Sequence, residues 1–163
     1  MKRRFNIRIH TEQSDYTEAA VSKLIPTAEP PTEVSAESEK IDFYTEGELV
    51  LGADGKYCLS YDESELTGME GSVTSVNFDM SERGLVTLMR TGNYRMVMVF
   101  ERGVRHICTY QTPYMPIELC VATRKLENSL GADGGELYVE YSIETNSMRC
   151  ELTKLRLVAM PIK

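Results

Sequence analysis

Few residues in this sequence of 163 could catalyse a reaction. A Ser–His–Asp or Cys–His arrangement needs a histidine as general base, and the chain holds two histidines, His10 and His106. His10 closes the first predicted strand beside an acidic segment. His106 lies in mid-strand between Val104 and Cys108, where a histidine in a barrel wall is more common than a general base. Neither base can be paired with a nucleophile, so we predict no catalytic residue.

Carboxylate pairs and glycine turns offer no stronger case for catalysis or phosphate binding. Asp62 and Glu63 are adjacent on a predicted strand, so their side chains point to opposite faces and do not form an acid–base pair. Gly68 and Gly71 lead into the alternating run Ser72–Phe78, whereas a phosphate-binding loop leads into the N-terminus of a helix. We interpret both features as turns between strands.

The four cysteines are Cys58, Cys108, Cys120 and Cys150. None of their spacings is Cys-x-x-Cys. His106 and Cys108 share one strand face but supply only two ligands, whereas a structural zinc site takes four. We therefore expect reduced thiols on strands, no metal site and no cofactor.

The elements that must position any site are β-strands. From residue 41 onward, turn-forming residues recur at short intervals. In the runs between them, apolar residues occupy every second position. Such alternation, with connections too short for crossover helices, predicts antiparallel strands, about nine or ten in all. So many strands in one domain close up to hide their edges. The alternating residues are Ile41, Phe43, Thr45, Leu49 and Leu51; Tyr57, Leu59 and Tyr61; Met96, Met98 and Phe100; Leu137, Val139, Tyr141 and Ile143.

The segment of about residues 11–40 differs from the rest. It contains three of the six prolines, and the stretch 11–48 holds ten acidic residues against two lysines. We expect an acidic, proline-containing connector within one domain that spans residues 1–163. Tyr16, Ala20 and Leu24 share one helical face, which predicts a possible short helix over about residues 14–25 near the N-terminus.

The overall charge excludes some classes of partner. Lysine and arginine number 18 and acidic residues number 25, which gives a net charge of −7 and disfavours a nucleic-acid partner. No apolar run approaches the roughly 18 residues that span a bilayer, and the charged start Met1–Arg8 leaves no room for a signal-peptide core. We expect a cytoplasmic protein with no membrane partner and with an oligomeric state that the sequence does not define.

Three stretches together resemble one protein family. They are YDESELTGMEGSVT (61–74), FERGVRHICTYQTPY (100–114) and GGELYVEY (134–141), with RTG (90–92) and TRKLEN (123–128) between them. Over about residues 41–158 the chain is similar to the bacterial YwiB-like family, a domain of unknown function. The resemblance implies an all-β fold, a single antiparallel calycin-like (lipocalin-type) β-barrel of about eight to ten strands. It implies no known reaction, cofactor or substrate.

The candidate ligand-binding residues are polar and aromatic groups within or beside these stretches. We expect them to be Tyr61, Glu63, Arg90, His106 and Tyr110. Tyr61 and Glu63 share a strand face by parity, as do His106 and Tyr110. Inside a barrel, such groups could line a small-molecule site or form hydrogen-bonded core pairs, and parity alone does not decide between the two.

Three hypotheses of function remain, in this order. The first is a non-enzymatic barrel that binds a small apolar or amphiphilic ligand in its interior or mouth. The second is a barrel filled by its own side chains, acting as a structural or protein-interaction module. The third is an enzyme that uses Glu63, Arg90 or His106. A barrel of this scale is wide enough either to be filled or to hold one ligand, so the fold alone does not choose.

Overall fold

The computed structural model describes residues 2–16, 34–63, 69–145 and 149–162, with side chains over residues 2–14, 39–63, 69–144 and 151–162. Every regular element in these ranges is a β-strand. The described residues contain no helix long and apolar enough to cross a membrane. The strands are β1 (Lys2–Tyr16), β2 (Val34–Leu51), β3 (Lys56–Asp62), β4 (Ser72–Asp79), β5 (Glu82–Gly92), β6 (Met96–Glu101), β7 (Arg105–Gln111), β8 (Pro116–Asn128), β9 (Gly135–Thr145) and β10 (Arg149–Pro161).

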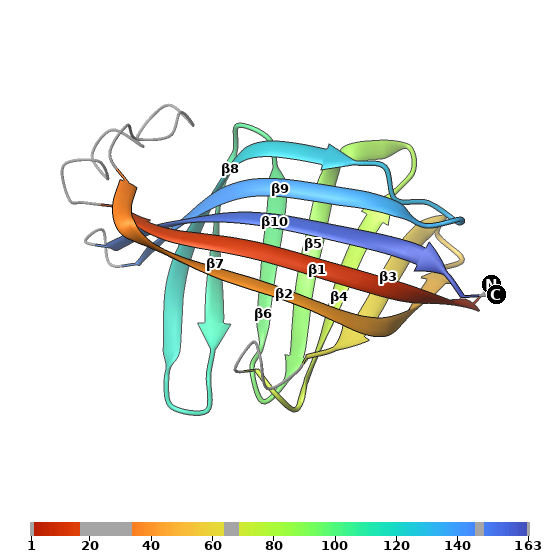
Figure 1. Cartoon of the computed structure of the whole chain (residues 1–163), viewed down its shortest axis with the longest axis horizontal. Coiled ribbons are helices and arrows are strands. Elements are labelled where there is room, and N and C mark those ends of the chain that lie inside the picture. Colours follow the sequence, from red (N-terminus) through yellow and green to blue (C-terminus); the bar gives the residue numbers. More distant parts are fainter. Residues whose placement is uncertain (1, 17–33, 64–68, 146–148, 163) are drawn as a thin grey trace.

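The ten strands form one antiparallel sheet in the order β6-β5-β4-β3-β2-β1-β10-β9-β8-β7. Consecutive strands therefore pair along the chain, except β6 and β7, and the pairing of β1 with β10 brings the two ends of the described chain side by side (Figure 1). The terminal strands of this order, β6 and β7, are joined by an isolated bridge, in which Arg95 and Gln111 exchange backbone hydrogen bonds of 2.9 and 2.8 Å. The result is a nearly closed barrel, which confirms the predicted antiparallel fold of eight to ten strands.

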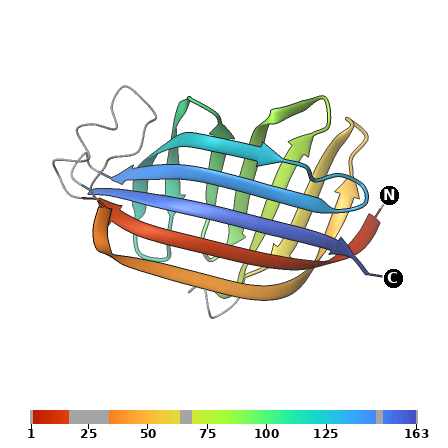
Figure 2. The same cartoon turned by 45° about the horizontal axis from the view of Figure 1, so that its top comes forward.

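The strands near the two ends of the chain form one side of the barrel. In both views β2, β1, β10, β9 and β8 lie next to one another as a curved layer, and β3, β4, β5 and β6 run across them (Figures 1 and 2). A sheet that twists and curves in this way encloses an interior, and the residues at alternate positions face it. The predicted alternation is confirmed by burial: Leu59 and Tyr61 of β3, and Met96, Met98 and Phe100 of β6, are all buried.

One end of the barrel is filled by apolar side chains, and we call it the packed end. Leu130, in the connection between β8 and β9, is 1% exposed and closes this end. These side chains leave no cavity between them that could hold a water molecule, so this end forms a close-packed core. The packed end consists of Phe5, Leu49, Leu59, Phe78, Leu130, Leu137, Leu157 and Ala159.

The expected connector over residues 11–40 is strand at both of its ends. β1 continues to Tyr16, and β2 begins at Val34, while residues 17–33 lie outside the described residues. The alternation of apolar side chains fades here because the strands continue with polar residues such as Thr11 at their inward positions. The assignment of residues 1–163 to one domain stays a prediction.

The prediction of a short helix over about residues 14–25 is wrong at its first residues. Residues 14–16 are the last residues of β1, because the ladder with β2 continues through them, and the pairing ends at Tyr16↔Val34. The remaining positions of that helix lie outside the described residues.

Two leucines on neighbouring strands test where the stability resides. Leu137 of β9 is fully buried in the packed end, whereas Leu155 of β10 faces the open interior described below. We expect Leu137→Ala to lower the free energy of unfolding by about 3 to 5 kcal/mol, because it leaves a cavity in a close-packed core. Leu155→Ala should cost about 2 kcal/mol, because this side chain already has fewer neighbours to lose. Urea denaturation measures both, and equal losses would contradict the division into two ends.

Candidate functional site

The interior is hollow at the end opposite the packed end, and we call this the open end. It contains a cavity of about 710 Å³. Much of the lining is apolar, and four strands supply a large part of it: Ile41 and Phe43 of β2, Met96 and Met98 of β6, Ile143 of β9 and Leu155 of β10. Gln13 and Glu39, which are paired across β1 and β2, lie at the rim, where Glu39 is exposed.

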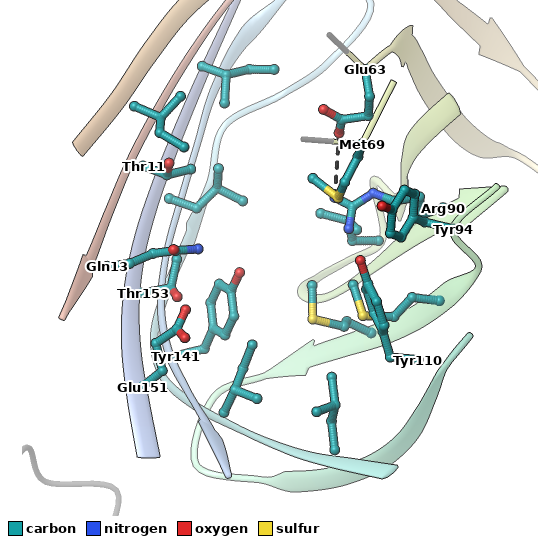
Figure 3. A pocket seen from close by; sticks show the side chains of 18 of the residues that line it. Thr11, Gln13, Glu63, Met69, Arg90, Tyr94, Tyr110, Tyr141, Glu151 and Thr153 are labelled. Atoms are coloured by element: carbon teal, nitrogen blue, oxygen red, sulfur yellow. Dashed lines mark hydrogen bonds and ion pairs between the residues drawn. The ribbon is translucent and has the colours of Figure 1, made fainter. Parts of the chain in front are cut away.

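A buried ion pair lies on one wall of the cavity. Arg90 Nη2 is 3.4 Å from Glu63 Oε1, and the two side chains are 10% and 2% exposed. Thr74, fully buried, links them, because its hydroxyl donates to Glu63 Oε1 at 2.5 Å and accepts from Arg90 Nε at 3.1 Å. We call these three residues the ion-pair cluster; Figure 3 shows Glu63 and Arg90 on one side of the cavity.

The sheet register brings the cluster together. Tyr61 of β3, Thr74 of β4 and Arg90 of β5 are successive cross-strand partners, so they form one row across three strands. Glu63 follows β3 directly, and its backbone N–H donates to Ser72 O at 2.9 Å, which holds its carboxylate above that row.

A glycine at the end of β5 permits the close approach of the chain beside Arg90. Gly92 has a φ of +113°, which L side chains rarely adopt. A Cβ at this position would lie 2.4 Å from the carbonyl oxygen of Gly71, which precedes β4. A glycine is therefore required at position 92, two residues beyond Arg90, where the end of β5 lies against the start of β4.

Four tyrosines surround the cavity. Tyr94 and Tyr110 lie near Arg90, with ring centroids 6.1 Å apart, and Tyr141 lies on the facing wall with Gln13 and Thr153 (Figure 3). Burial raises the pKa of Tyr61, and the Glu63 carboxylate adds to this effect.

Burial also raises the pKa of Tyr110 and Tyr141. The Arg90 guanidinium opposes the increase at both phenols, and the pKa of Tyr141 reaches about 12. Both phenols are therefore neutral near pH 7 and can both donate and accept a hydrogen bond.

Four of the five residues expected from the sequence meet in this cavity: Tyr61, Glu63, Arg90 and Tyr110. His106 does not line it. Its side chain shares the inward face of β7 with Tyr110 but lies farther along the strand, opposite Val121, and its Nε2 is 3.4 Å from Glu101 Oε1.

Sequence reasoning missed two neighbours of Arg90. Thr74 has the parity of Val76 and Phe78 in β4, and this signal would have placed it inside the barrel. Tyr94 follows the turn after β5, where no alternation exists to orient it.

The site has limited scope for metal or nucleophilic chemistry. Within the described ranges, no group of three or more histidine, cysteine or acidic residues could hold a metal ion. Cys58, Cys108 and Cys120 are free thiols, whereas the side chain of Cys150 lies outside the described residues. The described residues that line the cavity include neither histidine nor cysteine, so they provide no nucleophile paired with an imidazole base.

The fold and the site define a class of protein: a ten-stranded antiparallel barrel, packed at one end and hollow at the other. The chain belongs to the family described as Domain of unknown function (DUF1934), whose model matches residues 31–157. The crystal structure of the ywiB protein from Bacillus subtilis is similar in fold, with a TM-score of 0.65 and 20% sequence identity, over 95% of this chain and 92% of that chain. No curated protein matches the chain. The resemblance to the YwiB-like family is thus confirmed.

The ion-pair cluster predicts a strong coupling between its charged members. Arg90→Met should lower the free energy of unfolding by about 3 to 5 kcal/mol, because it leaves the Glu63 carboxylate buried without its main counter-charge. The double variant Arg90→Met, Glu63→Gln should lose much less than the sum of the two single variants, as measured by urea denaturation. Arg8→Met, which breaks an exposed pair with Asp42, is the control and should cost little. If the double variant lost as much unfolding free energy as the two single variants together, the predicted coupling would be wrong.

The raised pKa of Tyr141 predicts a loss of stability at alkaline pH. An unfolded tyrosine ionises near pH 10, whereas Tyr141 in the folded chain ionises at about 12. Between these values the unfolded chain releases a proton that the folded chain retains, so stability should fall with rising pH, by up to about 1.4 kcal/mol per pH unit for this one group. Tyr141→Phe should reduce that slope in denaturation curves measured across the window. Tyr114→Phe, at an exposed ring, is the matched control, and an unchanged slope in Tyr141→Phe would contradict the prediction.

Proposed function

We propose that this protein binds one small apolar or amphiphilic molecule in the open end of its barrel. The observation that carries the proposal is the cavity of about 710 Å³, which lies within the range of about 300–1,000 Å³ typical of small-molecule sites. Such sites combine mainly apolar walls with a few well-placed polar groups. Here the apolar wall includes Met98 and Ile143, and the polar groups are the ion-pair cluster and the tyrosines.

The contrast between the two ends supports this proposal. The same strands that close-pack at one end leave a large void at the other, and a void forfeits the dispersion contacts that its lining would otherwise make. A bound molecule would restore those contacts. Up-and-down barrels of the lipocalin type hold ligands in this way, and the meander order of the present sheet is compatible with that class.

Three methionines suit a site that accepts a flexible apolar chain. Met69, Met96 and Met98 line the cavity; Met69 lies beside Arg90 in Figure 3, and Met96 is the cross-strand partner of Arg90. Thioether side chains are unbranched and polarizable, so they adapt to ligands of different shape. We therefore expect the site to accept ligands whose apolar parts differ in shape, and to be more selective for the chemistry of the polar head.

The two other hypotheses have less support. A structural or interaction module with a filled barrel does not account for the void, and an enzyme would need a paired nucleophile and base, which the described lining does not offer. A cytoplasmic location and the lack of nucleic-acid or membrane partners stay predictions from the sequence.

Binding of an uncharged apolar dye tests the proposal. N-phenyl-1-naphthylamine should become strongly fluorescent when it enters the cavity, with saturation at one dye per chain. Ile143→Trp should abolish most of this signal, because the larger ring extends into the cavity. Ile107→Trp is the matched control, since Ile107 is 72% exposed on β7, and it should bind the dye like the parent. No saturable signal in the parent, or an equal signal in Ile143→Trp, would contradict the proposal.

A further inference from the structure

The ion-pair cluster restricts the chemistry of the polar head that the cavity can take. We infer that the occupant is an uncharged amphiphile, with a hydroxyl or carbonyl oxygen as its head, rather than a fatty-acid anion or an alkylammonium cation. This inference rests on the proposed function and specifies the class of ligand at the same site.

The first step is that the wall already contains a compensated pair of charges. Glu63 and Arg90 are opposite in sign, their side chains are 2% and 10% exposed, and Thr74 bonds to both. A buried carboxylate or guanidinium is tolerated only with its counter-charge and hydrogen bonds in place. The pair therefore satisfies itself before any ligand arrives, and it presents no net charge to the cavity.

The second step concerns a ligand that carries a charge. A carboxylate head at Arg90 would share one guanidinium with Glu63, which leaves a net negative charge in a poorly solvated site. An ammonium head at Glu63 would leave a net positive charge for the same reason. Glu39 at the rim, Glu151 on the wall beside Tyr141 and the net charge of −7 of the whole chain further disfavour an anion, so the argument against a cation rests on the ion pair alone.

The third step is that neutral partners are abundant. Arg90 has five N–H groups; Nε–H is directed at Thr74, one on Nη2 at Glu63, and the guanidinium also bonds to the Tyr110 phenol, so the remaining N–H groups can donate to a ligand oxygen. Tyr110 and Tyr141 supply neutral phenols from facing walls (Figure 3). The buried Thr153 hydroxyl, beside Tyr141, makes no hydrogen bond of good geometry with the described residues.

An uncharged oxygen therefore gains hydrogen bonds in the cavity without disturbing the ion pair. A hydroxyl both donates and accepts, and a carbonyl accepts from the guanidinium or from a phenol. A head of this kind avoids the cost of an uncompensated buried charge, so the selectivity comes from the ion pair itself.

Three probes with one apolar chain and different heads test the inference. They are decanoate, 1-decanol and decylammonium, each competing with N-phenyl-1-naphthylamine for the parent protein near neutral pH. We expect 1-decanol to displace the dye at a concentration at least about tenfold lower than either charged probe. Decanoate and decylammonium are used below their micelle concentrations and 1-decanol below its solubility limit, so that displacement reports binding.

Two charge-removing variants make the test specific to the ion pair. In Glu63→Gln the guanidinium of Arg90 loses its counter-charge, so decanoate should gain about tenfold or more in affinity and should raise the melting temperature of the variant. In Arg90→Met the remaining carboxylate should favour decylammonium instead. The double variant Glu63→Gln, Arg90→Met should again prefer 1-decanol. Thermal melts establish that each variant is folded. If a variant is not folded, the concentrations at which the three probes displace the dye from the parent protein test the inference.

The outcomes separate the two proposals. If the dye binds and decanoate or decylammonium displaces it from the parent as well as 1-decanol does, the inference on the head group is wrong while the proposed function stands. The inference is also wrong if 1-decanol fails to displace a bound dye, or if a folded Glu63→Gln variant keeps the preference of the parent. If the dye itself does not bind, the proposed function fails and this inference fails with it.

Discussion

The pairing of β1 with β10 joins the first strand of the chain to the last and thereby unites both halves of the sheet. A meander of ten strands leaves its first and last strands as open edges unless they pair, and here they pair from Phe5↔Pro161 to Asp15↔Glu151. This ladder brings the inward residues of the two chain ends into one wall. That wall carries Thr11 and Thr153, and it faces the ion-pair cluster, at the end of β3 and on β4 and β5, across the cavity (Figure 3). Without the pairing, the cluster would lie on an open sheet exposed to water.

The division into a packed end and an open end follows from a gradient along each strand. In β1 the inward residues change from phenylalanine and isoleucines to threonine and glutamine. In β10 they change in the opposite chain direction, from leucines to threonine and glutamate, because the strands are antiparallel. In β4 the series is Phe78, Val76, Thr74. Apolar groups therefore fill one end, and polar groups that need partners gather at the other. The residues concerned are Phe5, Ile7, Ile9, Thr11 and Gln13 of β1, and Leu157, Leu155, Thr153 and Glu151 of β10.

The same gradient explains what the sequence could and could not predict. Where the inward residues are apolar, alternation identifies the strands and their inner face, as in Leu137 to Ile143. Where they turn polar, as at Gln13 and Glu39, the strand continues but its signature is lost. The alternation along a strand also shows on which face of the sheet a residue lies, but not how far along the barrel it lies. His106 and Tyr110 were placed correctly on one face of β7, yet they are four positions apart, roughly 13 Å along a strand, and only Tyr110 reaches the cavity.

The position of Thr74 gives the polar wall its preorganisation. Its hydroxyl is fully buried and is fixed by a backbone paired on both sides, with Tyr61 in β3 and with Arg90 in β5. Because one hydroxyl orients both the carboxylate of Glu63 and the guanidinium of Arg90, the donors that face the cavity are set by the sheet and not by the ligand. A head group that fits them need not reorder these side chains, so little of its binding free energy is lost to conformational entropy. The network that stabilises this wall is thus the same network that makes it selective.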